Sequence, residues 1–166
     1  AAKNAFIKAA EIAKSSGTKV ALSLSDSFCV NRHRESFIEL VEDYIDILFA
    51  NEDEIKSLYK TSNLNLAIEK LKKKCELAAV TIGKQGSILI EDRKEIAIDP
   101  FILGKAIDTT GAGDLYAGGF LKGLSDGLSP SISAKIGSIC AGQIVTQLGS
   151  RSNTDLSTLV KSHLKR

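Results

Sequence analysis

The sequence predicts a three-layer α/β fold with a mostly parallel sheet, and two observations favour this class. Helical and strand periodicities alternate from the N-terminus to about residue 100. Segments rich in glycine or polar residues follow the expected strands, at the positions where α/β proteins bind ligands. The 166 residues, 43% of them hydrophobic and 25% charged, suffice for a single α/β domain over residues 1–166.

The N-terminal part of the sequence contains a repeated helix-then-strand unit. The first helix is expected over residues 3–15, where apolar residues recur at helical spacing, namely Ala5, Phe6, Ala9, Ala10, Ile12 and Ala13. The segment KVALSLS follows it as a short apolar strand. Residues 33–44 again show helical spacing, and IDILFA at 45–50 has the pattern of a strand. It leads into NEDEIKSLY, whose early acidic residues suit the start of a helix.

The rest of the chain continues the alternation and then becomes helical. A helix at about residues 64–74 precedes the buried strand LAAVTIG. The segments GSILIED and KEIAID are expected as two strands joined by a tight polar turn at Asp92 and Arg93. From Gly111 the pattern is helical almost to the end, with breaks at residues 126–130 and 149–153.

Composition and charge exclude several classes of partner. The net charge of +2 arises from 22 basic and 20 acidic residues, and no basic stretch is interleaved with aromatic residues. Nucleic acid is therefore not expected as a partner. No apolar run approaches the length of a membrane span, and the N-terminal segment carries charges where a signal peptide would be apolar. We therefore expect no membrane partner and a cytoplasmic location.

The cysteine and histidine residues indicate no metal or disulfide site. Cys29, Cys75 and Cys140 are odd in number, far apart and form no CxxC pair, which predicts free thiols. His33 and His163 have no second ligand at zinc-binding spacing. A nucleophilic pair of Cys29 and His33 is a minor alternative that nothing else in that segment supports.

Three junctions carry the chemistry of the sequence, and each is expected to follow a strand. They are ANEDE, TIGKQGS and DTTGAGD, which an α/β sheet would place along one edge. Neither a GxxxxGK[ST] loop nor a GxGxxG loop after a strand occurs in the chain. A bound nucleotide would therefore be held by other means.

The third junction is suited to binding an anion. Gly111, Ala112 and Gly113 can direct successive backbone N–H groups outward at a helix N-terminus, where the helix dipole favours negative charge. Asp114 is either a helix N-cap or first-turn acid, or a base that accepts a proton during phosphoryl transfer. The glycines around Ala112 favour the functional interpretation, because a plain cap does not need them.

The other two junctions have structural interpretations as well as functional ones. NEDE after a strand is by itself more typical of an acidic helix start than of a metal site. TIGKQGS is by itself most simply a turn between strands, in which Gly83 and Gly86 supply positive backbone angles.

The segment DTTGAGD followed by LYAGGFLKGL resembles the C-terminal signature of the PfkB carbohydrate kinases, which have the ribokinase-like fold. In that family the final aspartate is the catalytic base and the GAG turn forms an anion hole. The resemblance implies these roles for Asp114 and for Gly111, Ala112 and Gly113. It also implies a three-layer, Rossmann-like arrangement for the chain.

The two other motifs occur in the family's order. Asn51 and Glu54 match an N-x-x-E motif that helps to organise Mg²⁺ and phosphate, which implies a metal contact through water. Thr81, Gly83 and Gly86 match a T-x-G-x-x-G turn that packs against the nucleotide. The resemblance therefore implies ATP and Mg²⁺ as ligands and phosphorylation of a hydroxymethyl group on a sugar or nucleoside.

The wider resemblance is to the bacterial adenosine-kinase-like branch, through LSLSDSFCVNRHRESF and GQIVTQLGSR. The stretch from Ser138 to Ala141 lacks the asparagine that ribokinases often carry beside the adenine pocket. Only the C-terminal half of the family pattern is covered, without the N-terminal part and its β lid. We therefore expect this chain to be inactive alone and to self-associate, for example as a homodimer, because apolar surface or a sheet edge would be bare.

Two alternative functions differ from this interpretation. A non-catalytic regulatory module could hold a nucleotide or phosphate at the same turn, although the intact Asp114 argues against it. An α/β hydrolase is disfavoured because the chain has no G-x-S-x-G elbow.

Overall fold

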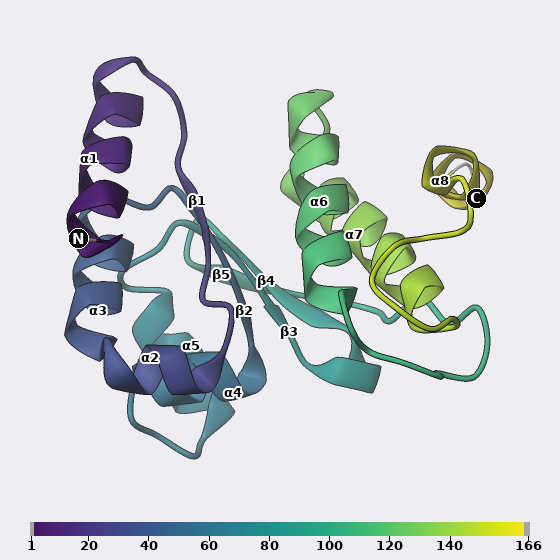
Figure 1. Cartoon of the computed structure of the whole chain (residues 1–166), viewed down its shortest axis with the longest axis horizontal. Coiled ribbons are helices and arrows are strands. Elements are labelled where there is room, and N and C mark those ends of the chain that lie inside the picture. Colours follow the sequence, from purple (N-terminus) through teal and green to yellow (C-terminus); the bar gives the residue numbers. More distant parts are fainter. Residues whose placement is uncertain (1, 165–166) are drawn as a thin grey trace. The chain divides into compact units, whose positions relative to one another are not determined.

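The computed structural model describes residues 2–164, which form an α/β fold (Figure 1). The helices are α1 (Ala2–Ser15), α2 (Ser27–Arg32), α3 (Arg34–Asp43), α4 (Glu52–Leu58), α5 (Leu64–Leu71), α6 (Ala112–Ser125), α7 (Pro130–Ile144) and α8 (Leu156–Leu164), with a 3₁₀ turn η1 (Gly83–Gln85). The strands are β1 (Ala21–Ser23), β2 (Ile47–Asn51), β3 (Leu77–Thr81), β4 (Ser87–Glu91) and β5 (Lys94–Ile98). None of the helices within residues 2–164 is long and apolar enough to cross a membrane.

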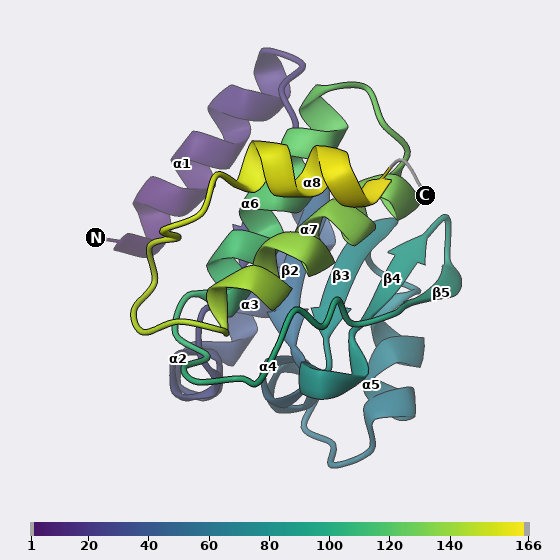
Figure 2. The same ribbon diagram turned by 90° about the vertical axis from the view of Figure 1, so that its right-hand side faces the viewer.

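The strands form one five-stranded sheet in the order β1-β2-β3-β4-β5, and Figure 2 labels β2 to β5 of it. β1 and β2 are parallel, with Ala21 opposite Ile47 and Ser23 opposite Phe49. β4 and β5 are joined by Asp92 and Arg93 alone, whose φ angles are 50° and 64°. Positive φ at both central residues is typical of a type I′ hairpin, so these two strands are antiparallel and the sheet is mixed.

The chain divides into two compact units, Ala1–Val80 with Ile90–Glu95 and Thr81–Leu89 with Ile96–Arg166. The core of the first unit is formed by fully buried aliphatic side chains on β2, α4 and α5, namely Leu48, Ile55, Leu58, Ile68 and Leu71. Each such side chain stabilises the fold by about 1.5–3 kcal/mol through burial. The N-terminus of α4, which carries a predicted functional motif, is therefore held by a packed core.

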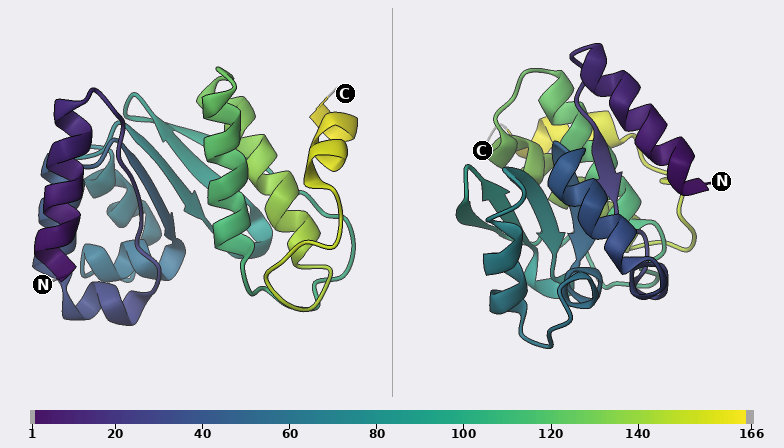
Figure 3. Two further views of the ribbon diagram at one scale, coloured as in Figure 1. Left: turned by 45° about the horizontal axis from the view of Figure 1, so that its top comes forward. Right: turned by 90° about the vertical axis from the view of Figure 1, so that its left-hand side faces the viewer.

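Helix α2 is an element of the first unit that the sequence pattern does not predict (Figure 3). Its single turn and a half begins at the N-cap Asp26, whose side chain accepts a hydrogen bond of 2.8 Å from Cys29 N. Only Val30 in this helix is buried, and Phe28 is 85% exposed. With one buried residue the segment has no apolar periodicity, which explains why the sequence pattern predicts no helix there.

In the second unit, α6 and α7 approach each other so closely that their backbones touch. A Cβ atom added at Gly119 would lie 3.0 Å from Cys140 Sγ and 3.1 Å from Gly137 Cα. One added at Gly137 would lie 2.7 Å from the carbonyl oxygen of Tyr116. Glycine is required at both positions because any side chain there would force the helices apart.

The expectation that DTTGAGD directly follows a strand is wrong. Residues 99–111 are irregular, and they separate β5 from α6. The N–H groups of Ile107 and Asp108 donate to Val145 O, at 2.7 Å and 3.3 Å, so this segment is held against the end of α7 rather than within the sheet. A second difference is the strand expected over KVALSLS, which is confined to Ala21–Ser23.

Candidate functional site

A cavity of about 420 Å³ lies within the second unit. Its walls come from the turn at residues 81–86, the irregular segment at residues 100–109, and α6 and α7. Five of the predicted site residues line it, namely Thr81, Gly83, Gly86, Ala112 and Gly113. The second and third predicted motifs therefore meet at one cavity, although twenty residues of sequence separate them.

The N-terminus of α6 presents two unpaired backbone donors. Gly111 is the N-cap, with φ 81° and ψ 0° in the left-handed region, and no side chain caps the helix. Ala112 N donates to Thr109 O at 3.1 Å, and Leu115 N donates to Gly111 O at 2.9 Å. Within residues 2–164, the N–H groups of Gly113 and Asp114 have no acceptor. Two free donors at the positive end of a 14-residue helix form an environment that favours an anion.

The two glycines of this turn are required for different reasons. A Cβ atom at Gly111 would lie 2.7 Å from Ser150 Cβ, in addition to the strain of its positive φ. Gly113 has no positive φ, and a Cβ atom there would have no atom within 4 Å. Gly111 is therefore needed by the fold of the chain, whereas the space beside Gly113 is open and faces the cavity.

Asp114 lies in the first turn of α6 with an exposed side chain. It is not the N-cap, so that structural interpretation of Asp114 is wrong, whereas a first-turn acid remains compatible with its place. Its carboxylate has no hydrogen-bond or ion-pair partner among the described residues. The carboxylate is therefore available to a ligand.

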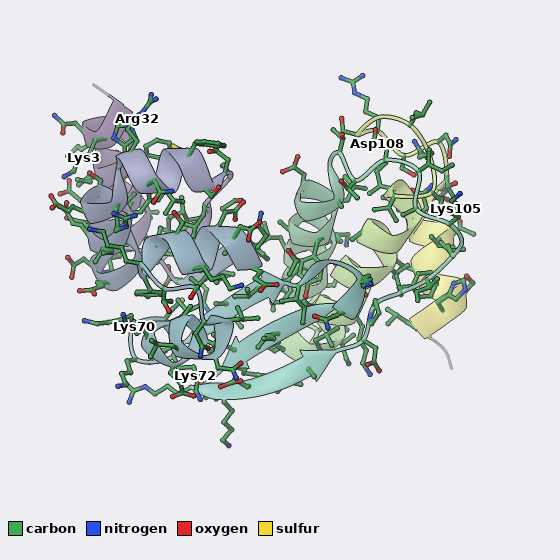
Figure 4. All side chains as sticks on the ribbon, turned by 90° about the horizontal axis from the view of Figure 1, so that it is seen from below. Lys3, Arg32, Lys70, Lys72, Lys105 and Asp108 are labelled. Carbon is green, nitrogen blue, oxygen red and sulfur yellow. The ribbon has the colours of Figure 1, made fainter. Side chains whose placement is uncertain are left out.

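Asp108 links the segment before α6 to the segment after α7, and Figure 4 labels it in the first of these. Its Oδ1 accepts hydrogen bonds from Thr110 N at 2.9 Å and Thr110 Oγ1 at 2.7 Å, and its Oδ2 accepts one from Gly149 N at 2.9 Å. The bonds from the Thr110 side chain and backbone, followed by that from Gly149, lower the pKa of Asp108 to about 2. Sequence reasoning assigned no role to Asp108, although an aspartate two residues before a threonine is a signal for such a turn.

Two buried hydroxyl groups that sequence reasoning also missed shape the cavity wall. Ser138 Oγ donates to Asp99 O at 2.9 Å and accepts from Phe101 N at 3.0 Å, so α7 fixes the start of the irregular segment. Tyr116 and Ser87 share a hydrogen bond of 2.8 Å, and burial raises the pKa of Tyr116 to about 12. Sequence reasoning gave neither hydroxyl group a role, because their hydrogen-bond partners are distant in the chain.

The turn at residues 82–86 has the geometry that its structural interpretation predicts. Gly83 and Gly86 have φ angles of 58° and 93°, and Ile82 N donates to Gly86 O at 2.9 Å. A Cβ atom at Gly86 would lie 2.1 Å from Ile98 O, so contact with the end of β5 is enough to require glycine there. The interpretation of this segment as a turn with positive backbone angles is confirmed, and contact of Thr81, Gly83 and Gly86 with a nucleotide stays a prediction.

Asn51 and Glu54 lie in the first unit and cap α4 reciprocally. Asn51 N and Asn51 Nδ2 donate to the two carboxylate oxygens of Glu54, at 2.9 Å and 2.7 Å, and Glu54 N donates to Asn51 Oδ1 at 2.9 Å. The interpretation of NEDE as a helix start is therefore confirmed. Burial, chiefly, raises the pKa of Glu54. The hydrogen bond from the Asn51 backbone lowers it, and the nearby charges of Asp26 and Asp53 raise it by smaller amounts.

The Asn51–Glu54 pair retains some capacity to bind a hydrated cation. Each Glu54 oxygen accepts one bond and has a further lone pair, which fits a contact with Mg²⁺ through water. In the part of the chain that the structure describes, no three His, Cys, Asp or Glu side chains are grouped to hold a metal. The metal role of Asn51 and Glu54 stays a prediction. Cys29, Cys75 and Cys140 are free, as expected.

Comparison with known proteins places the chain among kinases. The sequence model of the pfkB family carbohydrate kinases matches residues 2–156. A ribokinase from Lactococcus lactis is 33% identical over 133 residues, which cover 80% of this chain and 42% of that protein. The crystal structure of adenosine kinase from Sinorhizobium meliloti matches with a TM-score of 0.92 and 41% identity, over 97% of this chain and 50% of that one.

A ribokinase structure from Thermotoga maritima matches with a TM-score of 0.77 and 28% identity, over 95% of this chain and 52% of that one. The chain thus spans about half the length of the relatives that it matches. The fold, the three motifs in order and the family match agree. The chain belongs to the pfkB family of carbohydrate kinases.

Proposed function

We propose that this chain is the nucleotide-binding and catalytic half of a kinase that phosphorylates a hydroxymethyl group on a sugar or nucleoside, with ATP as donor. The observation that carries the proposal is the N-terminus of α6. There the free N–H groups of Gly113 and Asp114, the open space beside Gly113 and an unpartnered carboxylate occur together. Family membership supports the same reaction class.

The cavity suits the donor nucleotide. Its volume of about 420 Å³ lies in the range of small-molecule sites, and its lining is mostly apolar with glycines on two sides. The nucleobase of ATP would lie between the turn at residues 81–86 and the segment after Pro100, with Thr81, Gly83 and Gly86 in contact with the nucleotide. Phosphate groups would then meet the N-terminus of α6, where backbone donors and the helix dipole favour negative charge.

Asp114 would accept the proton of the attacking hydroxyl group. Phosphoryl transfer has a loose transition state, in which positioning of this carboxylate matters more than early proton removal. The turn of Gly111, Ala112 and Gly113 would stabilise the negative charge that develops on the transferred group. Asn51 and Glu54 would hold Mg²⁺ through water, and the ion would neutralise phosphate charge.

The first experiment tests nucleotide binding on the 166-residue chain itself. Titration calorimetry with the magnesium complex of a non-hydrolysable ATP analogue should show binding, and AMP should bind more weakly because it lacks the outer phosphates. The isolated chain should show no acceptor-dependent ATP turnover. Equal affinity for AMP and the ATP analogue would contradict the placement of phosphate at α6.

The second experiment tests catalysis in a chimera in which this chain replaces the matched half of the S. meliloti adenosine kinase. Asp114→Asn should lower kcat by a factor on the order of hundreds while the KM for ATP changes little. Asp126→Asn is the matched control, because Asp126 is an exposed aspartate at the other end of the same helix. Near-normal turnover of the Asp114→Asn chimera would refute the assignment of Asp114 as the base. Turnover of the active chimera with adenosine, ribose and fructose then identifies the acceptor class. A chimera that binds nucleotide but shows no turnover would favour a regulatory module.

A further inference from the structure

The part of the cavity wall formed by residues 102–106 depends on its two ends for its position. It contributes to the cavity lining the residues Ile102, Leu103, Gly104 and Ala106. Over the described range of the chain, 2–164, residues 102–106 make no hydrogen bond. Ile102 is 78% exposed and Leu103 is 45% exposed, so packing holds them only in part. The points that anchor this segment therefore control where the wall stands.

The anchors lie at Phe101 and Ile107, on either side of the segment. At the far end, Ile107 N donates to Val145 O at 2.7 Å. At the near end, Phe101 N donates to Ser138 Oγ at 3.0 Å. The backbone there also touches α7, because a Cβ atom added at Gly142 would lie 2.0 Å from Phe101 O. These contacts fix the backbone of Phe101, and its side chain has a further contact.

The ring of Phe101 makes an edge-to-face contact with the ring of His163 on α8. The ring centroids are 4.8 Å apart and the ring planes are at 80°, which is an arrangement that aromatic pairs prefer. The His163 ring is itself fixed, because its Nδ1 donates to Leu159 O at 2.9 Å and lies 2.8 Å from Ser162 Oγ. Figure 2 shows α8 beside α7. The cavity lining comes from other segments, so α8 acts on it from outside.

His163 has more consequence for the cavity than for the core. It is exposed, and within Leu156–Leu164 no side chain of α8 is buried. Removing its ring therefore takes little apolar surface out of the core. Its contact with Phe101, in contrast, acts on a residue that lines the cavity. The family match ends at residue 156, ahead of His163, and so assigns this residue no role.

We propose that His163 is a positioning residue for the donor nucleotide. Its ring fixes the ring of Phe101, and with it the start of the wall at residues 102–106. The inference rests on the proposed function, in which the nucleobase lies beside the segment after Pro100. An edge-to-face aromatic pair changes an equilibrium by about two- to tenfold. Loss of the His163 ring should therefore weaken nucleotide binding by about that factor and leave the phosphate end of the site unchanged.

The test measures binding of the ATP analogue and of AMP to the 166-residue chain by calorimetry. His163→Ala should raise both Kd values by the same factor, about two- to tenfold, because the two ligands share the nucleobase. His163→Phe should restore binding because it keeps an aromatic ring, whereas His163→Gln keeps a polar group without a ring and should not. In a Phe101→Leu chain, His163→Ala should have no further effect, because the partner ring is gone.

Ser157→Ala is the matched control, because Ser157 is an exposed residue of the same helix. It should bind both ligands as the unchanged chain does. In the chimera, His163→Ala should raise the KM for ATP and leave kcat unchanged. Thermal unfolding of each variant reports on folding, and a His163→Ala chain that is largely unfolded at the temperature of the assay would make the role structural and overturn the proposal.

Three results of the binding assay also overturn it. They are equal affinities of His163→Ala and the unchanged chain, an undiminished effect of His163→Ala in the Phe101→Leu chain, and binding by His163→Gln as tight as by His163→Phe. Each of these leaves the proposed function standing, because the unchanged chain still binds the ATP analogue. If the unchanged chain binds no nucleotide, the proposed function fails and this inference fails with it.

Discussion

Replacing each glycine of the anion-binding turn by alanine should have opposite effects on folding. Gly111→Ala forces an alanine to φ 81°, which costs about 1–2 kcal/mol relative to glycine. The new methyl group would also lie 2.7 Å from Ser150 Cβ, and relieving that overlap costs about 1–3 kcal/mol. The sum is a loss of about 2–5 kcal/mol in the free energy of unfolding. This is a large part of the stability of a typical domain.

Gly113→Ala has neither penalty. Its φ is not positive and no atom lies within 4 Å of the added Cβ, so the chain gains about 0.5–1 kcal/mol from the lower backbone entropy of the unfolded state. The same methyl group would stand in the open space where we place phosphate. We therefore expect Gly113→Ala to raise stability slightly and to weaken the binding of the ATP analogue by about tenfold or more, which is about 1.4 kcal/mol.

Urea denaturation of the 166-residue chain measures the first effect, and calorimetry with the ATP analogue measures the second. The free energy of unfolding should be highest for Gly113→Ala, intermediate for the unchanged chain and lowest for Gly111→Ala. If the free energy of unfolding of Gly111→Ala lies within about 0.5 kcal/mol of that of the unchanged chain, the steric argument is refuted, because ordinary surface substitutions have effects of that size. Undiminished binding by a folded Gly113→Ala chain would refute the phosphate position independently.

Three further predictions concern the cavity wall, the loop link and the metal. Ser138→Ala removes the hydrogen bonds to Asp99 O and Phe101 N, so the KM of the chimera for ATP should rise several-fold while kcat is unchanged. An unaltered KM would contradict a role for these bonds in shaping the cavity. The folded-state pKa of Asp108, about 2, lies below its usual value of 3.8. Its contribution to stability is therefore present above pH 3.8 and lost as the pH falls towards 2, so the difference in Tm between the unchanged chain and Asp108→Asn should shrink over that window. Glu54→Gln should raise the Mg²⁺ concentration for half-maximal turnover of the chimera, and an unchanged dependence would leave Glu54 as a helix cap alone.

The fold was predictable where periodicity and turn chemistry agree. The hairpin at Asp92 and Arg93 follows from two alternating apolar segments with a polar pair between them, and the helix after Gly111 follows from long apolar spacing. Helix α2 was missed because Val30 is its only buried residue. The irregular segment before Gly111 was missed because its order comes from Val145, Ser138 and other distant partners, which local pattern cannot reveal.

The site was predictable in its glycine turns and not in its supporting side chains. The sequence identified Gly86 and Gly113 equally, yet Gly86 is required by contact with Ile98 O and Gly113 faces open space. Only the folded structure distinguishes a glycine that the chain needs from one that leaves room for a ligand. The supporting roles of Ser138 and Tyr116 were not predicted, because hydroxyl groups bonded to residues 29 or more positions away carry no local signal.

The contact of α6 with α7 through Gly119 and Gly137 determines which parts of the second unit can move when a ligand enters. At both points glycine lets the backbones approach closely, and the side chains of Cys140 and Tyr116 pack beside them, so a slide or tilt of one helix against the other would break close contacts. We therefore expect the donors at Gly113 and Asp114 to keep their direction when a ligand binds. Opening and closing fall to the segments at residues 99–111 and 145–155, which lack regular structure. We therefore expect ligand exchange to depend on these two loops, while the N-terminus of α6 keeps its position.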